Sequence, residues 1–146
     1  MGYRGRGYVV IGILSICIFL CGLETFSSPT LLPTDANPEA TVTIIIQHRV
    51  FRPSLIHLRT GRKTRLIIQN HDAELHAFVP IDFLKRTSVQ VSGNGAPEFG
   101  RDGFRRVLIP SAGQAELLFI PRQSGTYAFS CDLPGHVMAG TIVVEE

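Results

Sequence analysis

Short runs of β-forming residues, separated by turn residues, fill the chain from residue 41 to its end. Apolar side chains recur at every second position, as in Val42, Ile44 and Ile46, which is the period of a strand with one buried face. Turn-forming clusters such as Asn70-His71-Asp72 separate these runs, and no run after residue 41 keeps a long helical period. Seven or eight short strands at this spacing predict an all-β fold, a sandwich or a barrel.

Residues 82–103 interrupt this pattern with four glycines and no clear periodicity. Loops of this length in a compact domain are usually functional or mobile. We interpret the segment as a solvated loop with a short helical turn near residues 81–85. A docking surface or a lid over a site is the alternative interpretation.

The first 28 residues have the order of an export signal. Arg4 and Arg6 precede an uncharged apolar run over residues 8–23, and Ser27 and Ser28 supply small residues for a cleavage site. The run is shorter than the ~20 residues of a membrane-spanning helix. We therefore expect residues 1–28 to be a signal peptide, with an uncleaved membrane anchor as the alternative. The mature protein is then periplasmic or extracellular, either free or anchored to the outer face of the cytoplasmic membrane.

The remaining chain divides into a linker and one domain. Residues 29–40 contain three prolines and predict an extended linker, and residues 41–146 are long enough for one hydrophobic core. Removing residues 1–28 lowers Lys+Arg from 14 to 12 and Asp+Glu from 12 to 11, a net charge of +1. This near-neutral charge gives no electrostatic basis for nucleic-acid binding. We expect a monomer that contacts a membrane only if residues 1–28 are retained.

Three sulfur- and nitrogen-bearing side chains, Cys131, His136 and Met138, lie within eight residues near the C-terminus. Cys131 is the only cysteine after the apolar segment, so an exported domain offers it no disulfide partner. An intermolecular bridge, a free thiol and a metal ligand remain as explanations, and a buried inert cysteine is the alternative. Strand alternation directs Cys131 to the same side as Phe129, and Pro134-Gly135 turns the chain so that His136 can return toward the thiol.

A thiolate, an imidazole and a thioether are ligands that select copper, and a second histidine would complete a trigonal His₂Cys site. His76, within an apolar run, is the candidate, although a lone histidine of this kind is also typical of a hydrogen-bonded core residue. We expect the other histidines, His48, His57 and His71, to be surface residues.

The motifs Phe51-x-Pro53, His76-x-Phe78, Cys131-x4-His136 and Gly140-Thr141 together resemble the cupredoxins, the family of plastocyanin and azurin. The resemblance covers most of residues 41–146 and implies a Greek-key β-sandwich with one copper ion. It implies His76, Cys131 and His136 as equatorial ligands and Met138 as the axial ligand, or as part of the adjoining apolar shell.

Two residues bear on how far the resemblance extends. Ala77 stands where azurin and plastocyanin have an asparagine that ties the ligand loops together. Asp132 is a candidate to replace that tie by accepting a hydrogen bond from a backbone amide.

The resemblance implies an exported protein with a mononuclear type 1 copper site, Cu(I)/Cu(II), that transfers single electrons through transient contacts with redox protein partners. Two alternatives remain: a periplasmic copper carrier or metallation partner for a cuproenzyme, and a metal-free secreted β-sandwich interaction module. We do not expect an enzyme, because a dinuclear copper centre needs two cysteines in the ligand loop and only Cys131 is present there.

Overall fold

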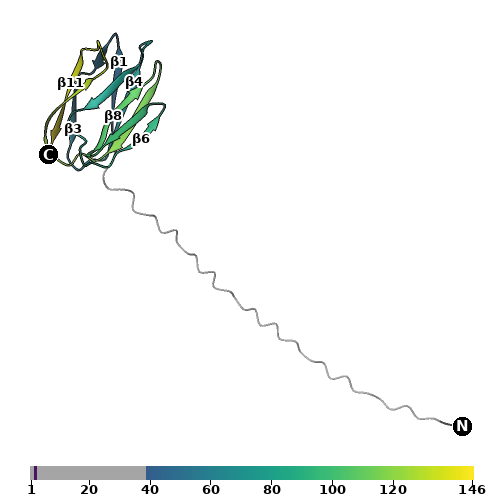
Figure 1. Cartoon of the computed structure of the whole chain (residues 1–146). Helices are drawn as coiled ribbons and strands as arrows, with labels where there is room; N and C mark the ends of the chain where they lie inside the picture. Colours follow the sequence, from purple (N-terminus) through teal and green to yellow (C-terminus); the bar gives the residue numbers. More distant parts are fainter. Residues whose placement is uncertain (1, 3–38) are drawn as a thin grey trace. The chain divides into compact units, whose positions relative to one another are not determined.

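The computed structural model describes Gly2 and residues 39–146; the predicted signal or anchor, and the linker up to residue 38, lie outside the described residues. Residues 39–146 form two β-sheets packed into a sandwich (Figure 1), and this part of the chain contains no α-helix. Eleven strands are present in it: β1 (Ala40–Gln47), β2 (Val50–Arg52), β3 (Leu55–Arg59), β4 (Thr64–Asn70), β5 (His76–Pro80), β6 (Gln90–Gly93), β7 (Ala96–Gly100), β8 (Gly103–Ile109), β9 (Gln114–Phe119), β10 (Gly125–Cys131) and β11 (Met138–Glu145). The predicted all-β sandwich is confirmed.

The two sheets differ in size, but each contains one parallel pair of strands. The five-stranded sheet has the order β2-β1-β4-β9-β6, and the six-stranded sheet has the order β3-β11-β10-β5-β8-β7. Pairs β1–β4 and β3–β11 are parallel, and the remaining pairs are antiparallel. No helix among the described residues is long and apolar enough to cross a membrane.

The sandwich has more strands than the seven or eight predicted, because three short strands do not show the alternation of apolar and polar side chains on which the prediction was based. β2 has only three residues, and β6 and β7 lie within residues 82–103, which we interpreted as a loop. β6 is an edge strand of one sheet and β7 an edge strand of the other. Edge strands of this kind bury little on either face, so they show no hydrophobic period. The turn predicted near residues 81–85 is present, as a hydrogen-bonded turn rather than a helix.

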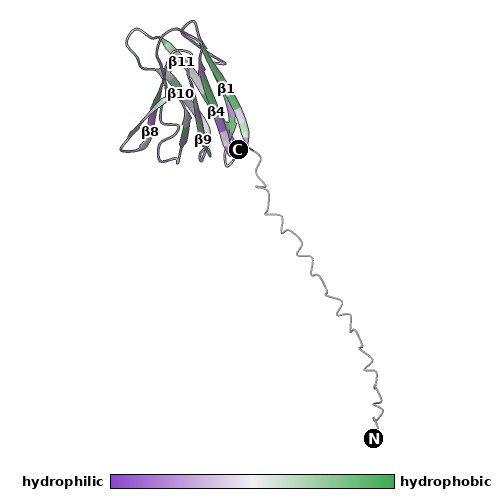
Figure 2. Ribbon diagram, turned by 90° about the vertical axis from the view of Figure 1, so that its right-hand side faces the viewer, coloured by the Kyte–Doolittle hydropathy of each residue, from purple (hydrophilic) through white to green (hydrophobic). Residues whose placement is uncertain are grey.

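Alternating burial along the central strands produces the core between the sheets. β4 alternates buried and half-buried residues over its whole length, and β9 does so as well. Figure 2 shows hydrophobic residues along β1 and hydrophilic ones on β8. The core is therefore built by the period-two pattern that the sequence displays.

An aromatic cluster of Phe51, Phe78 and Phe129 fills the core beneath one end of the sandwich. All three side chains are fully buried, and their ring centroids lie 5.0 to 6.3 Å apart. Gly140 pairs with Phe129 across strands β10 and β11. A Cβ atom at residue 140 would lie 2.1 Å from Cζ of Phe129, so only glycine leaves room for this ring.

Candidate metal centre

Strands β5 and β10 deliver the first two predicted ligands to the same end of the six-stranded sheet. His76 is the first residue of β5 and Cys131 is the last residue of β10, and these strands are antiparallel neighbours. His76 is fully buried and Cys131 is 5% exposed. The backbone N–H of Ala77 donates a hydrogen bond to Sγ of Cys131 at 3.3 Å, which joins the two strands at the thiol.

The third predicted ligand, His136, reaches the thiol from the loop between β10 and β11. Gly135 has a φ of 78°, a left-handed conformation that favours glycine, and the N–H of His136 donates to the carbonyl of Leu133. This turn reverses the chain and brings Nδ1 of His136 within 3.4 Å of Sγ of Cys131. The predicted return of His136 toward Cys131 is therefore what the structure shows.

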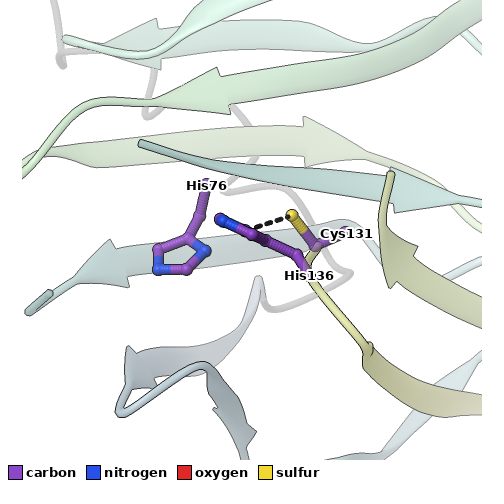
Figure 3. A group of neighbouring side chains, drawn as sticks. All are labelled: His76, Cys131 and His136. Atoms are coloured by element: carbon purple, nitrogen blue, oxygen red, sulfur yellow. Dashed lines mark hydrogen bonds between the residues drawn. The ribbon is translucent and has the colours of Figure 1, made fainter. Parts of the chain in front are cut away.

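His76, Cys131 and His136 converge on one small region. One ligand atom from each lies within 4.8 Å of those of the other two, and the centroids of the two imidazole rings are 4.8 Å apart. Figure 3 shows the two rings side by side, with the Cys131 sulfur next to His136. Two imidazoles and one thiol in this arrangement are the donor set of a trigonal copper site.

Nδ1 of His76 supplies a direct test of whether this donor set fits a metal ion. It is the one buried side-chain nitrogen or oxygen atom among the described residues that has no hydrogen-bond partner. Buried polar atoms nearly always have partners, because an unsatisfied one loses its hydration without compensation. A metal ion bound between the imidazoles and the thiol would supply that partner, so the residues fit the copper that the resemblance implies.

The hydrogen bond between His76 and Asp72 determines which ring nitrogen is available. Nε2 of His76 lies 2.9 Å from Oδ2 of Asp72. Burial opposes ionisation of Asp72, but hydrogen bonds from the backbone amides of Arg49 and His48 and from His76 together lower its pKa. An ionised carboxylate only accepts, so Nε2 of His76 is the donor, and Nδ1 is the ring nitrogen left to bind a metal ion.

Asp72 is itself fixed by the turn between β1 and β2. The N–H groups of His48 and Arg49 donate to Oδ1 and Oδ2 of Asp72 at 2.7 and 2.9 Å. Both residues have positive φ, 55° and 56°, a conformation that bulky side chains adopt at an energetic cost. The two hydrogen bonds from these backbone amides to the carboxylate offset that cost and orient Asp72 toward His76.

Glu74 lies beside both imidazoles. Its Oε1 is 3.8 Å from Nε2 of His76, and its Oε2 is 3.7 Å from Nε2 of His136. Arg49 donates to both oxygens of Glu74, at 2.5 and 2.7 Å, and this bond is the main cause of the lowered pKa of Glu74. The Glu74 carboxylate therefore lies beside Nε2 of both rings, whereas the thiol lies beside Nδ1 of His136.

Met138, the predicted axial ligand, lies directly across the strand pair from Cys131. It is the first residue of β11, its register partner is Cys131, and its side chain is 4% exposed. Residues directly opposite each other in an antiparallel pair project to the same face with Cβ atoms about 4.5–5.5 Å apart. The thioether is thus at the same end of the core as the other three side chains, and its ligation stays a prediction.

Asn70 fastens the loop that precedes His76 to the end of β8. Asn70 is fully buried, and its Nδ2 contacts the carbonyls of Glu74, Ile109 and Pro110 at 2.7 to 3.0 Å. Its Oδ1 accepts from the N–H of Asp72 at 2.9 Å. Ala77 takes part through its backbone alone, in the hydrogen bond to Cys131.

Asp132 does not play the part that the sequence suggested. Both of its oxygens accept from Nη1 of Arg106 at 2.9 Å, and Arg106 also binds Glu98 on β7. The guanidinium provides a stronger, charge-assisted partner than a backbone amide does. Asp132 therefore connects the ligand loop to β8 and β7.

The other three histidines are exposed, as predicted: His48, His57 and His71. The sequence reasoning missed Asp72 and Glu74 as partners of the imidazoles. The signal was present, because Asp72 is four residues before His76, but we interpreted Asn70-His71-Asp72 only as a turn. Carboxylates that orient metal-binding histidines are common enough to be sought in such a turn.

The comparisons with known proteins agree with this geometry. The profile of the cupredoxin-like domain family matches residues 13–144, which is most of the chain. The chain therefore belongs to the cupredoxin-like family. A comparison with curated protein sequences gave no match.

Among solved structures, similar folds include the auracyanins. Auracyanin A of Chloroflexus aurantiacus, described as a "blue" copper protein, is 17% identical with a TM-score of 0.56, over 74% of this chain and all of that one. The auracyanin of Roseiflexus castenholzii is 18% identical with a TM-score of 0.57, over 73% of this chain and 98% of that one. At these identities the likeness shows a shared fold.

Proposed function

We propose that the protein is an exported electron carrier with a single copper ion bound by His76, Cys131 and His136 and, axially, by Met138. The observation that carries this proposal is the buried, unpartnered Nδ1 of His76 at the point where a thiol and a second imidazole also meet. Bound copper supplies a one-electron couple between Cu(I) and Cu(II). Residues 1–28 would direct export, residues 29–40 would be the linker, and residues 41–146 would be the electron-transfer domain.

The chain's own residues would hold the ligands in place while the copper ion changes its oxidation state. Asp72 fixes the His76 ring through Nε2, and Ala77 donates to the thiol of Cys131. Hydrogen bonds of this kind orient the ligands and tune the metal. A site held in this way needs little rearrangement between two oxidation states, which favours electron transfer.

His136 provides the route to a redox partner. Its side chain is 9% exposed, and it is flanked by Val137, which is fully exposed, while Leu75 next to His76 is 43% exposed. Small apolar surfaces of this kind support weak, transient redox contacts. We propose that a periplasmic or extracellular redox protein binds a monomer here.

Copper delivery is the second candidate, since the same ligands would serve it. Delivery needs ligands that release the metal readily, whereas Asp72 holds the His76 ring and is itself held by hydrogen bonds from two backbone amides. The hydrogen-bond network therefore favours electron transfer over delivery.

The test is to titrate the purified protein with Cu(II) and to measure the visible absorption. We expect an intense blue band from the thiolate–copper bond, with one ion per chain, which a mild reductant bleaches and an oxidant restores. Well-folded protein without this band would refute the copper site. A band that disappears because copper passes to an acceptor protein, without redox cycling, would favour delivery.

A further inference from the structure

The end of the sandwich opposite the candidate metal centre carries a band of positive charge. Three adjoining surface hollows share lining residues: the first and second have Arg122 in common, and the second and third have Lys85 in common. Six cationic residues line them, and we call these the cationic band: Lys63, Lys85, Arg86, Arg101, Arg105 and Arg122. Two carboxylates, Asp82 and Asp102, share the hollows, so the excess is six minus two, or four positive charges.

Most of this charge is not neutralised by ion pairs within the described domain. Lys85 forms an ion pair with Asp82 at 2.7 Å, and Lys63 lies 3.8 Å from Glu39. The four arginines of the band form no ion pair with other described residues, and all four are exposed: Arg86, Arg101, Arg105 and Arg122. Guanidinium groups gathered in this way on one surface attract anions, including phosphate groups.

Exposed aliphatic side chains lie among these charges. Ile120 lines the first hollow and Ile81 the third, and each is 46% exposed. Cations that alternate with exposed apolar side chains are typical of surfaces that bind at the boundary between lipid headgroups and acyl chains. An acidic protein surface would be attracted by the charges but would leave the isoleucines without a specific role.

The chain enters the domain at this band. β1 begins at Ala40, whose N–H donates to the carbonyl of Lys63 at 2.8 Å. Eleven residues of the predicted linker 29–40 precede β1, and they span at most about 35–40 Å. If residues 1–28 are retained as an anchor, the chain that leads from the anchor joins the domain beside this band.

We propose that the cationic band is a docking surface for an anionic lipid bilayer, such as one that contains phosphatidylglycerol. The proposal rests on residues 1–28 staying attached and is independent of copper. The metal centre would then face away from the bilayer. β10 begins at Gly125, close to Arg122 and Gln123 of the second hollow, and ends at Cys131. These two ends lie about 20 Å apart along the strand.

A tryptophan reporter tests the proposal in the full chain, because the protein contains no tryptophan. Gln123→Trp places the reporter in the second hollow, at an exposed position beside Arg122, and Ala73→Trp places it in an exposed loop at the metal end. Metal-free protein is reconstituted in nanodiscs that contain a dansyl-labelled lipid, with phosphatidylcholine alone or mixed with phosphatidylglycerol. We expect strong energy transfer from the Gln123→Trp variant only with phosphatidylglycerol, weak transfer from the Ala73→Trp variant in both, and loss of the difference at high salt.

Charge-removing variants make the test specific. A cation near an anionic surface contributes about fivefold to binding, so Arg122→Gln should lower the ratio of docked to undocked domain about fivefold. Arg101→Gln added to it should lower the ratio roughly 25-fold. Arg52→Gln, an exposed cation outside the band on β2, is the matched control and should change nothing.

Energy transfer from the Gln123→Trp variant that is equal in both lipid mixtures would overturn the proposal. If soluble poly-glutamate then binds the protein and Arg122→Gln weakens that binding, the band would be assigned to an acidic protein partner. Because these measurements use metal-free protein, failure of the copper proposal would not alter them.

Discussion

Replacing Asp72 by Asn tests how the candidate site is held together. The carboxylate accepts three N–H groups: His48 at Oδ1, and Arg49 and His76 at Oδ2. An Asn side chain has one oxygen and one NH₂ group in the same volume. In its best orientation, the oxygen takes the Oδ2 position and the NH₂ group faces the N–H of His48, so one donor is left unpaired.

The size of the effect follows from these contacts. Loss of one hydrogen bond to a charged group should lower the free energy of unfolding by about 1.5–3 kcal/mol. For a domain of this size, that corresponds to a fall in Tm of roughly 6–20 °C. The weaker acceptor also holds His76 less firmly, and loss of such a partner typically lowers metal affinity by 10–100-fold, or about 1.4–2.8 kcal/mol.

Copper affinity is measured by competition with a chelator of known affinity, and stability is measured by thermal unfolding of the metal-free protein. Asp82→Asn is the matched control, because Asp82 is 65% exposed and lies at the opposite end of the domain. A structural role alone would lower Tm without changing the copper-bound absorption spectrum or the reduction potential. If Asp72→Asn binds copper with unchanged affinity and spectrum, Asp72 does not orient His76 for a metal ion.

Three further changes address the ligands and the core beneath them. Cys131→Ser should abolish the blue absorption band, because a hydroxyl is a poor copper ligand compared with a thiolate; a retained band would show that another group supplies it. Met138→Leu should keep the band but shift the reduction potential in voltammetry if the thioether is axial, and an unchanged potential and spectrum would place Met138 in the apolar shell. Gly140→Ala should destabilise the metal-free domain by about 1–3 kcal/mol in denaturant unfolding, because the added methyl group meets the Phe129 ring; Phe129→Leu should suppress this loss in the double variant, and additive losses would contradict the steric explanation.

The sequence predicted the sandwich because its central strands obey a simple rule. Strands such as β4 and β9 bury alternate residues, and the same alternation is visible in the order of their apolar and polar residues. β6 and β7 were not predicted, because both faces of an edge strand are largely exposed and leave no hydrophobic period. Their pairing depends on the neighbouring strands β9 and β8, which is information from tertiary structure.

The positions of the candidate ligands could be predicted from the sequence, but the hydrogen bonds that hold the ligands and their loop in place could not. Cys131 and His136 lie in one short motif, and the alternation of side chains along the strand is enough to direct the thiol inward. The role of Asp72 depends on a turn 23 and 24 residues upstream, whose amides it accepts. No local pattern connects such distant segments, and the Arg106 partner of Asp132, 26 residues away, escaped prediction for the same reason.

The hairpin turn at His48 and Arg49 has a consequence for how the protein matures. The turn, the loop that contains Asp72 and the end of β10 come from distant parts of the chain, and hydrogen bonds join them: His48 donates to Asp72, and Ala77, next to His76, donates to Cys131. The site is thus assembled by folding, and copper would bind to a domain that is already folded. Export and folding could then precede any encounter with the metal, and copper supply would determine how much of the folded protein is competent rather than how much of it folds.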